Sequence, residues 1–145
     1  MKKIVIINGP NLDLLGERQP EIYGKMTLAQ INKEIKKFAS GLGFSTEFHQ
    51  SNSEGEIIKV LHKYRKGAAG IIINAAGYSH TSVAILDALL ALEVPAVEVH
   101  LSNIYRREEF RQKSITAQGT VGIISGFGKI GYLMAVGYLA GLYKE

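Results

Sequence analysis

Ala69-Gly-Ile-Ile-Ile-Asn74 is the stretch of sequence that decides the fold. It stays apolar from residue to residue up to its polar end, without the alternation expected of a strand that has one face in water. A strand of this kind is buried on both faces, which is typical of a parallel sheet covered by helices on either side. The residues before and after it therefore have to supply both covering layers.

Short apolar runs alternate with amphipathic segments along the rest of the chain. We predict further strands at 3–7, 44–50, 95–100 and 120–125, and helices at 27–42, 53–67, 81–92, 106–113 and 131–143. The first helix opens with the capping box Thr27-x-x-Gln30, and its apolar stripe is Leu28, Ile31, Ile35, Phe38 and Leu42. Strands separated by helices imply right-handed crossovers. We therefore predict an α/β fold with a flavodoxin-like, doubly wound, five-stranded parallel sheet of order 2-1-3-4-5.

Composition limits the class of protein. The 145 residues are 46% hydrophobic and 21% charged, which describes a single domain spanning 1–145. The absence of Cys excludes disulfides, thiolate metal sites and cysteine nucleophiles, and it fits a reducing cytoplasm. The apolar run 132–143 is far shorter than the ~20 residues of a membrane-spanning helix, and the first residues are too briefly apolar for a signal peptide. We expect a cytoplasmic protein with no membrane partner.

The net charge of +4 invites a nucleic-acid interpretation, which the charge pattern disfavours. Basic residues alternate with acids, as in Arg106-Arg107-Glu108-Glu109-Phe110-Arg111, and no run of five like charges occurs. We expect no nucleic-acid partner. A small anionic ligand makes better use of a modest positive field.

The connection after the first strand, residues 9–26, is too long for an ordinary turn, which takes about 2 to 6 residues. Connections of this length often act as lids, and this one carries Asn11, Arg18 and Tyr23 among glycines and prolines. A nearby Arg favours the phenolate form of a Tyr. The same residues also fit a packed Ω-loop in which Tyr23 is an apolar anchor, and the pattern leaves both interpretations open.

Glu98-Val-His100 ends the fourth predicted strand, at the edge where sheets of this type bind ligands. Alternate residues of a strand share a face, so the Glu98 carboxylate can orient the His100 imidazole. A single His at a strand end is more often structural. The carboxylate beside it and the position at the ligand edge favour an acid or a base.

Two further pairs can be placed on helical faces. Arg107 and Arg111 lie one turn apart in the predicted helix 106–113, where they either bind an anion or pair with Glu108 and Glu109 in solvent. His80 and Asp87 are seven residues apart, on one side of the predicted helix 81–92, with His80 near its amino terminus. Asp87 stands among apolar residues, so we expect it to be buried and paired, across a subunit boundary if not within the chain.

Gly126-Phe-Gly128-Lys-Ile-Gly131 matches the GxGxxG dinucleotide fingerprint by letter only. The fingerprint requires a following strand and an acidic residue about 20 positions later, and the remaining residues are helical in pattern. We interpret these glycines as turn and close-packing residues. The HExxH, GxxxxGK[ST], DxDxDG and GxSxG motifs are missing, and four dispersed His without a carboxylate cluster do not suggest a metal site.

Six ordered stretches together resemble the type II 3-dehydroquinate dehydratases across nearly the whole chain. They are Asn8-Gly-Pro-Asn-Leu-Asp-Leu-Leu-Gly16-Glu-Arg18 with Ile22-Tyr23-Gly24, Gln50-Ser-Asn-x-Glu54-Gly, Ile73-Asn74-Ala-Ala-Gly-Tyr78-Ser-His80-Thr-Ser82, Glu98-Val-His100-Leu-Ser-Asn103, Arg107-Glu-Glu-Phe-Arg111, and Gly126-x-Gly128-x-x-Gly131-Tyr132.

The resemblance implies a lyase that converts 3-dehydroquinate to 3-dehydroshikimate in the shikimate pathway through an enolate, without metal or organic cofactor. It implies that Tyr23 is the base, assisted by Arg18, that Asn11 holds a water, and that His100, oriented by Glu98, is the acid. The residues that it assigns to substrate binding are Asn74, His80, Asp87, Leu101, Ser102, Arg111 and Arg107, with Asp87 reaching a neighbouring subunit's site.

The resemblance also implies a homododecamer built as a tetramer of trimers. Residues 131–143 are apolar nearly all round, so more than one side of that helix should be buried. The alternative function is a catalytically silent flavodoxin-like module that binds small carboxylates. Such a module would bind without turnover and would tolerate the loss of Tyr23.

Overall fold

The apolar run after Ala69 forms β3 (Gly70–Asn74), which lies in the middle of the sheet and is buried along its whole length. The computed structural model describes residues 1–144, and its sheet has the order β2-β1-β3-β4-β5. The other strands are β1 (Lys2–Asn8), β2 (Phe44–Gln50), β4 (Ala96–His100) and β5 (Gly122–Ser125). Every neighbouring pair is parallel. The predicted fold class and strand order are confirmed.

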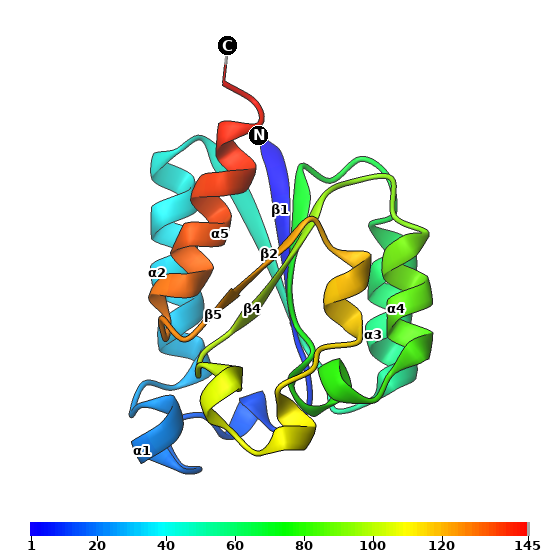
Figure 1. Ribbon diagram of the computed structural model, residues 1–145. Coiled ribbons are helices and arrows are strands. Elements are labelled where there is room, and N and C mark those ends of the chain that lie inside the picture. The colour runs from blue at the N-terminus through cyan, green and yellow to red at the C-terminus, as the bar shows by residue number, and fades with distance from the viewer. Residues whose placement is uncertain (145) are drawn as a thin grey trace.

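Helices cover both faces of this sheet (Figure 1). α2 (Leu28–Gly41) and α5 (Ile130–Gly141) pack on one face, and α3 (Glu54–Lys63) and α4 (Val83–Leu90) on the other. Strand β1 shows why two cores form, because Ile4 and Ile6 point into the first and Val5 and Ile7 into the second.

Helix α2 forms where the sequence predicts it, but its apolar stripe is only partly buried. The Thr27 hydroxyl accepts a hydrogen bond from the Gln30 amide, and the Gln30 side chain accepts one from the Thr27 amide, which completes the capping box. Ile31 and Ile35 are buried, whereas Phe38 and Leu42 are exposed at the far end of the helix. The stripe therefore predicts the helix correctly and overstates how much of it the sheet covers.

Helix α5 buries one side and leaves the other uncovered. Tyr132, Ala135, Val136 and Leu139 face the core, while an outer row of side chains is exposed: Ile130, Met134, Tyr138 and Leu142. The single chain therefore does not bury α5 on every side. No helix in residues 1–144 is both long and apolar enough to cross a membrane.

Short segments gather at the carboxyl edge of the sheet, opposite the N-terminus (Figure 1). They are η1 (Leu12–Leu14), α1 (Pro20–Tyr23), η2 (Ala76–His80), η3 (Ile104–Arg106) and η4 (Glu109–Arg111). A further turn, η5 (Thr116–Gly119), packs beside α4 and leads into β5 (Figure 1).

The predicted helix over 106–113 is wrong. Arg107 is extended (ψ −174°) and separates η3 from η4. The Gln112 side-chain amide donates to the Arg107 carbonyl, which takes the place of a helical backbone hydrogen bond. The two turns that result direct both Arg107 and Arg111 toward the same pocket.

Candidate active site

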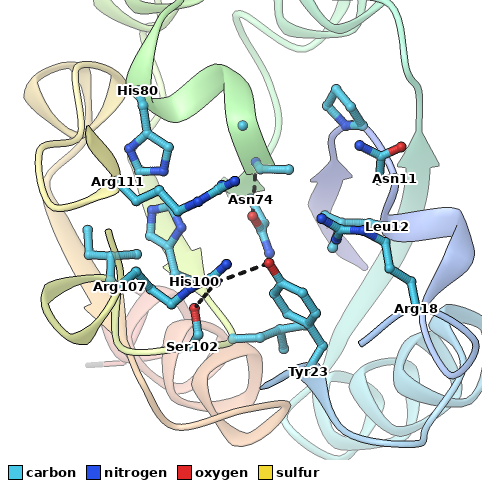
Figure 2. Close-up of a pocket in the computed structure, with 15 residues that line it drawn as sticks. Asn11, Leu12, Arg18, Tyr23, Asn74, His80, His100, Ser102, Arg107 and Arg111 are labelled. Carbon is cyan, nitrogen blue, oxygen red and sulfur yellow. Dashed lines mark hydrogen bonds between the residues drawn. The ribbon is translucent and has the colours of Figure 1, made fainter. Parts of the chain in front are cut away.

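A polar pocket opens at the carboxyl ends of the strands, between the segment after β1 and the turns after β3 and β4 (Figure 2). In a doubly wound sheet the strand order reverses here, which is where ligands bind. Three arginines give it a positive character, and two histidines also line it. Its lining residues are Pro10, Asn11, Leu12, Arg18, Tyr23, Asn74, Ala76, Gly77, His80, His100, Leu101, Ser102, Ile104, Arg107 and Arg111.

The Tyr23 hydroxyl lies between two guanidinium groups. Arg107 Nη1 donates to it at 3.1 Å and also donates to the Ser102 hydroxyl at 3.1 Å, as the dashed lines in Figure 2 show. The central guanidinium carbon of Arg18 lies 5.2 Å from the Tyr23 ring centroid, on the Asn11 side. Burial raises the pKa of Tyr23, but the hydrogen bond and charge of Arg107, followed by those of Arg18, outweigh it and lower the pKa below its usual value.

The backbone before Tyr23 holds that side chain over the pocket. Gln19 adopts a left-handed conformation (φ 43°), and Pro20 then starts the single turn of α1. The Gly24 amide closes that turn on the Pro20 carbonyl at 2.8 Å. Gly16, also left-handed (φ 91°), packs against Lys25 and Thr27, so the middle of the loop lies against its C-terminal end. Residues 9–26 are therefore an ordered loop with Tyr23 on its inner side.

His100 and Glu98 form a hydrogen-bonded pair in which His100 Nε2 lies 2.7 Å from a Glu98 oxygen. Both come from β4, and Glu98 is fully buried behind the imidazole. The Glu98 carboxylate also accepts the Ser114 hydroxyl at 2.5 Å and the Thr116 hydroxyl. Burial raises the pKa of Glu98, but the hydrogen bond and charge of His100 and the two hydroxyl donors together lower it below the usual value. The pair matches the prediction from alternate strand residues.

His80 and Asn74 approach the same pocket from β3 and the turn after it. His80 Nδ1 lies 2.9 Å from the Lys113 carbonyl oxygen, so Nδ1 carries the proton, because a carbonyl oxygen only accepts. Asn74 Nδ2 donates to the Tyr132 hydroxyl at 3.1 Å, and that hydroxyl donates to Asn8 Oδ1 at 2.5 Å. Asn74 Oδ1 accepts the Ala76 amide at 3.1 Å. This buried chain fixes the orientation of the Asn74 amide.

Asn11 stands at the opposite wall in a left-handed conformation (φ 69°). Its backbone amide donates to Asn52 Oδ1 at 2.9 Å, which leaves its side chain at the pocket surface (Figure 2). Gly9 permits this path, because a Cβ at that position would lie 2.5 Å from the Ala75 carbonyl oxygen.

The glycine-rich stretch after β5 shapes the turn beside Leu101. The Gly126 and Gly128 amides donate to the carbonyls of His100 and Leu101, at 3.3 and 3.0 Å. Both glycines have positive φ, and a Cβ on Gly126 would lie 3.0 Å from the Asn103 side chain. Their role as turn and packing residues is confirmed.

Comparison with known proteins agrees with this geometry. The family model described as "Dehydroquinase class II" matches residues 2–140. The chain belongs to the type II dehydroquinase family. A "3-dehydroquinate dehydratase" from Clostridium botulinum (strain 657 / Type Ba4) is 52% identical over 139 residues, which cover 96% of this chain and 95% of that protein.

Two solved type II dehydroquinases have the same architecture. The Propionibacterium acnes structure is 39% identical, covers 97% of both chains and has a TM-score of 0.93. The Butyrivibrio crossotus structure is 41% identical, covers 95% of this chain and 97% of its own, and also has a TM-score of 0.93. The resemblance noted from the sequence motifs is confirmed, and the chain is an enzyme of this dehydroquinase class.

The pocket of this type II dehydroquinase brings together most of the residues singled out from the sequence. Glu98 stands directly behind the lining, in contact with His100. The residues that reach the lining are Asn11, Arg18, Tyr23, Asn74, His80, His100, Leu101, Ser102, Arg107 and Arg111.

Asp87 is the exception. It is exposed on α4 and does not line the pocket, so the expectation of burial is wrong for the single chain. The apolar neighbours that suggested burial divide between two environments, with Ile85 and Leu89 inward and Leu90 outward.

Several supporting residues escaped the sequence reasoning. Ser114 and Thr116 bind Glu98, Tyr132 binds Asn74, and Asn52 binds the Asn11 backbone. Asn52 and Tyr132 stand inside family-like motifs, which is a usable signal, whereas Ser114 and Thr116 carry no local pattern. Within residues 1–144, no three His, Asp or Glu side chains converge as metal ligands would.

Proposed function

We propose that this pocket dehydrates 3-dehydroquinate to 3-dehydroshikimate in the shikimate pathway, with Tyr23 as the base and His100 as the acid. The Tyr23 phenolate takes the C2 proton, and the electrons of that C–H bond enter an enolate. The C1–C2 double bond then forms as the C1–O bond breaks, and His100 protonates the leaving oxygen so that it departs as water. Proton exchange with solvent restores both side chains.

The observation that carries the proposal is the environment of the Tyr23 hydroxyl. A proton next to a ketone needs a base that is stronger than a carboxylate and ionised near neutral pH. Lowering a phenol pKa from ~10 to near 7 takes about 4 kcal/mol. The hydrogen bond from Arg107 and the nearby charge of Arg18 act in that direction. The Tyr23 pKa is lowered despite burial, which supports a base rather than an apolar anchor.

The acid role of His100 is supported by its partner and position. Glu98 engages Nε2, so the other ring nitrogen remains for the substrate. Tyr23 and His100 reach the pocket from different elements, the loop after β1 and the end of β4 (Figure 2). With a substrate ring between them, Tyr23 would remove the C2 proton and His100 would protonate the C1 hydroxyl.

The remaining pocket groups suit the substrate's carboxylate and hydroxyls. We assign the carboxylate to Asn74 and to the backbone amides of Leu101 and Ser102, and the ring hydroxyls to His80 and Arg111. Asn11 would hold a water against the enolate oxygen. Preorganised donors of this kind supply much of the stabilisation of a developing enolate. In this proposal the reaction requires no metal or organic cofactor.

We further propose a cytoplasmic homododecamer, a tetramer of trimers, without nucleic-acid or membrane partners. Two features of the single chain support an assembly. The outer row of α5 is apolar and exposed, and the acid Asp87 stands exposed on α4, where it can reach a neighbouring subunit's pocket. Light scattering tests this, and a stable, active monomer would contradict it.

The function is tested by following enone absorbance after 3-dehydroquinate is added to the purified protein. We expect absorbance to rise as 3-dehydroshikimate forms. Calorimetric binding of the same compound without any rise would instead support a silent carboxylate-binding module.

The Arg107→Gln variant should move the acidic limb of the pH profile to higher pH, because the Tyr23 pKa returns toward its usual value when the donor is lost.

A further inference from the structure

The segment 113–116, which follows η4 and ends on the first residue of η5, contacts His80 directly and His100 through Glu98. The Lys113 carbonyl accepts the Nδ1 proton of His80 at 2.9 Å. The Ser114 and Thr116 hydroxyls donate to Glu98, which binds His100. The Ile115 amide donates to the Ser79 carbonyl at 2.7 Å, which holds the segment against η2. This short stretch of chain therefore supplies the acceptor for His80 and holds the acceptor of His100, the Glu98 carboxylate, in place.

The carboxylate of Glu98 is an unusual acceptor because it has no contact with water. Glu98 and Thr116 are both 0% exposed. One carboxylate oxygen accepts His100 Nε2 and Ser114 Oγ, and the other accepts Thr116 Oγ1. Burying an ionised carboxylate is costly unless hydrogen bonds replace its water, and two of these three donors are neutral hydroxyls.

We propose that Ser114 and Thr116 are positioning residues for the reaction, which keep the acidic proton of the Glu98–His100 pair on His100 rather than on Glu98. The proposal rests on the acid role of His100 proposed above. With three donors the carboxylate stays ionised, and the imidazole keeps protons on both nitrogens. With one hydroxyl missing the carboxylate becomes more basic and draws the proton from Nε2. The imidazole is then neutral and a poor acid.

This coupling has a signature in the pH profile. A more basic carboxylate holds the shared proton to higher pH, so the basic limb of the kcat profile moves upward while the plateau falls. Loss of packing alone would lower the plateau without moving the limb. The other titratable or charged groups facing His100 across the pocket are unchanged in the variants, namely His80, Arg18, Tyr23, Arg107 and Arg111. A shift relative to the wild type therefore reports on the Glu98–His100 pair.

The test compares Thr116→Val with Thr116→Ser, because the first removes the hydroxyl at nearly constant volume and the second retains it. Thr120→Val is the matched control, since the Thr120 hydroxyl belongs to the same region but bonds to the Ala117 carbonyl at 2.8 Å. We expect Thr116→Val and Ser114→Ala to lower kcat on 3-dehydroquinate at least about tenfold, as befits a hydrogen bond to a charged group, and to raise the basic limb. Thr116→Ser and Thr120→Val should match the wild type. An unchanged limb in Thr116→Val would overturn the proposal.

A second measurement does not depend on turnover. Nitrogen-15 NMR of protein labelled in the histidine rings reports which nitrogens carry protons. For the acid form of His100 we expect both ring nitrogens to carry protons in the wild type, and in Thr116→Val the Nε2 signal should move toward the unprotonated position. Identical His100 spectra in the two proteins would refute the coupling. If the spectra differ but His100→Asn retains full activity, the coupling stands and the acid role in the proposed function fails.

Discussion

The chain carries the same Glu-x-His pattern on two strands, and only one copy stands in the pocket. Glu47 and His49 on β2 lie 2.7 Å apart, as do Glu98 and His100 on β4. The His49 and Glu47 side chains are 29% and 31% exposed, whereas those of His100 and Glu98 are 6% and 0% exposed. β2 is an edge strand, and β4 lies inside the sheet.

The difference between the two pairs lies in their surroundings. Glu47 has a cation, Lys3 Nζ at 3.1 Å, and its imidazole partner faces the Tyr64 ring. Glu98 has two hydroxyls, and its partner, the last residue of β4, faces a pocket with three arginines. Strand spacing is enough to make the hydrogen bond. Only the second pair also lies at the pocket, at the carboxyl ends of the strands.

The comparison is tested most strongly by replacing the two histidines. We expect His100→Asn to lower kcat by about 10²- to 10⁴-fold, the usual contribution of a general acid. His49→Asn should leave kcat essentially unchanged, because its ring does not reach the pocket lining. Equal losses of activity in the two variants would show that the pairs do not differ in function.

Replacing the two glutamates should separate the pairs in stability. Glu98→Gln disrupts a fully buried set of hydrogen bonds and should lower the free energy of unfolding by about 1–3 kcal/mol. Glu47→Gln loses a partly exposed ion pair, so we expect a loss below about 1 kcal/mol. Urea unfolding of both variants and the wild type measures this. A larger loss for Glu47→Gln would reverse the assignment of buried and surface pairs.

The two glutamates should also differ in how their contributions to the free energy of unfolding change at acidic pH. The pKa of Glu98 is lowered by His100 and the hydroxyls against the opposing effect of burial, and the pKa of Glu47 is lowered first by its hydrogen bond to His49. Each group therefore contributes stability above the pKa of an unfolded glutamate and loses it as the pH falls through its folded value. The Glu47 contribution should weaken in high salt and the Glu98 contribution should persist. Unfolding titrations from pH 6 downward at two salt concentrations check this, and equal salt sensitivity would contradict it.

The smallest effect is expected from borohydride. Lys3 of β1 bonds to Glu47 of the pair on β2, whereas no lysine is found among the lining residues of the pocket. Activity should survive borohydride added together with 3-dehydroquinate, since no imine forms for it to reduce. Inactivation accompanied by a mass adduct on a lysine would place an amine in the reaction.

The sequence predicts those features that local geometry determines. The run after Ala69 identifies the central strand, and alternate positions on one strand place Glu98 beside His100. Tyr23 and Arg18 can be paired because they share one loop. In the fold Arg107, 84 residues later, makes the hydrogen bond to Tyr23, and no spacing rule connects residues that far apart.

Other features depend on packing that the sequence pattern does not encode. Arg107 and Arg111 share the pocket through two turns rather than through the predicted helix. Asp87 and Phe38 fall on helix surfaces that the single chain leaves open. Ser114 and Thr116 are ordinary residues of a connecting segment until the chain folds their hydroxyls onto Glu98.

The central claim is that Tyr23 is the base, and kcat of the Tyr23→Phe variant tests it most directly. The substitution keeps the ring and removes only the hydroxyl that Arg107 binds. We expect kcat on 3-dehydroquinate to fall by at least about 10²-fold while substrate binding is largely retained, because the lost interaction acts in the transition state. A variant that keeps more than about a tenth of the wild-type kcat has lost less activity than the ~10²-fold that is the smallest usual contribution of a general base. Tyr23 is then a packing residue, and the proposed mechanism is wrong.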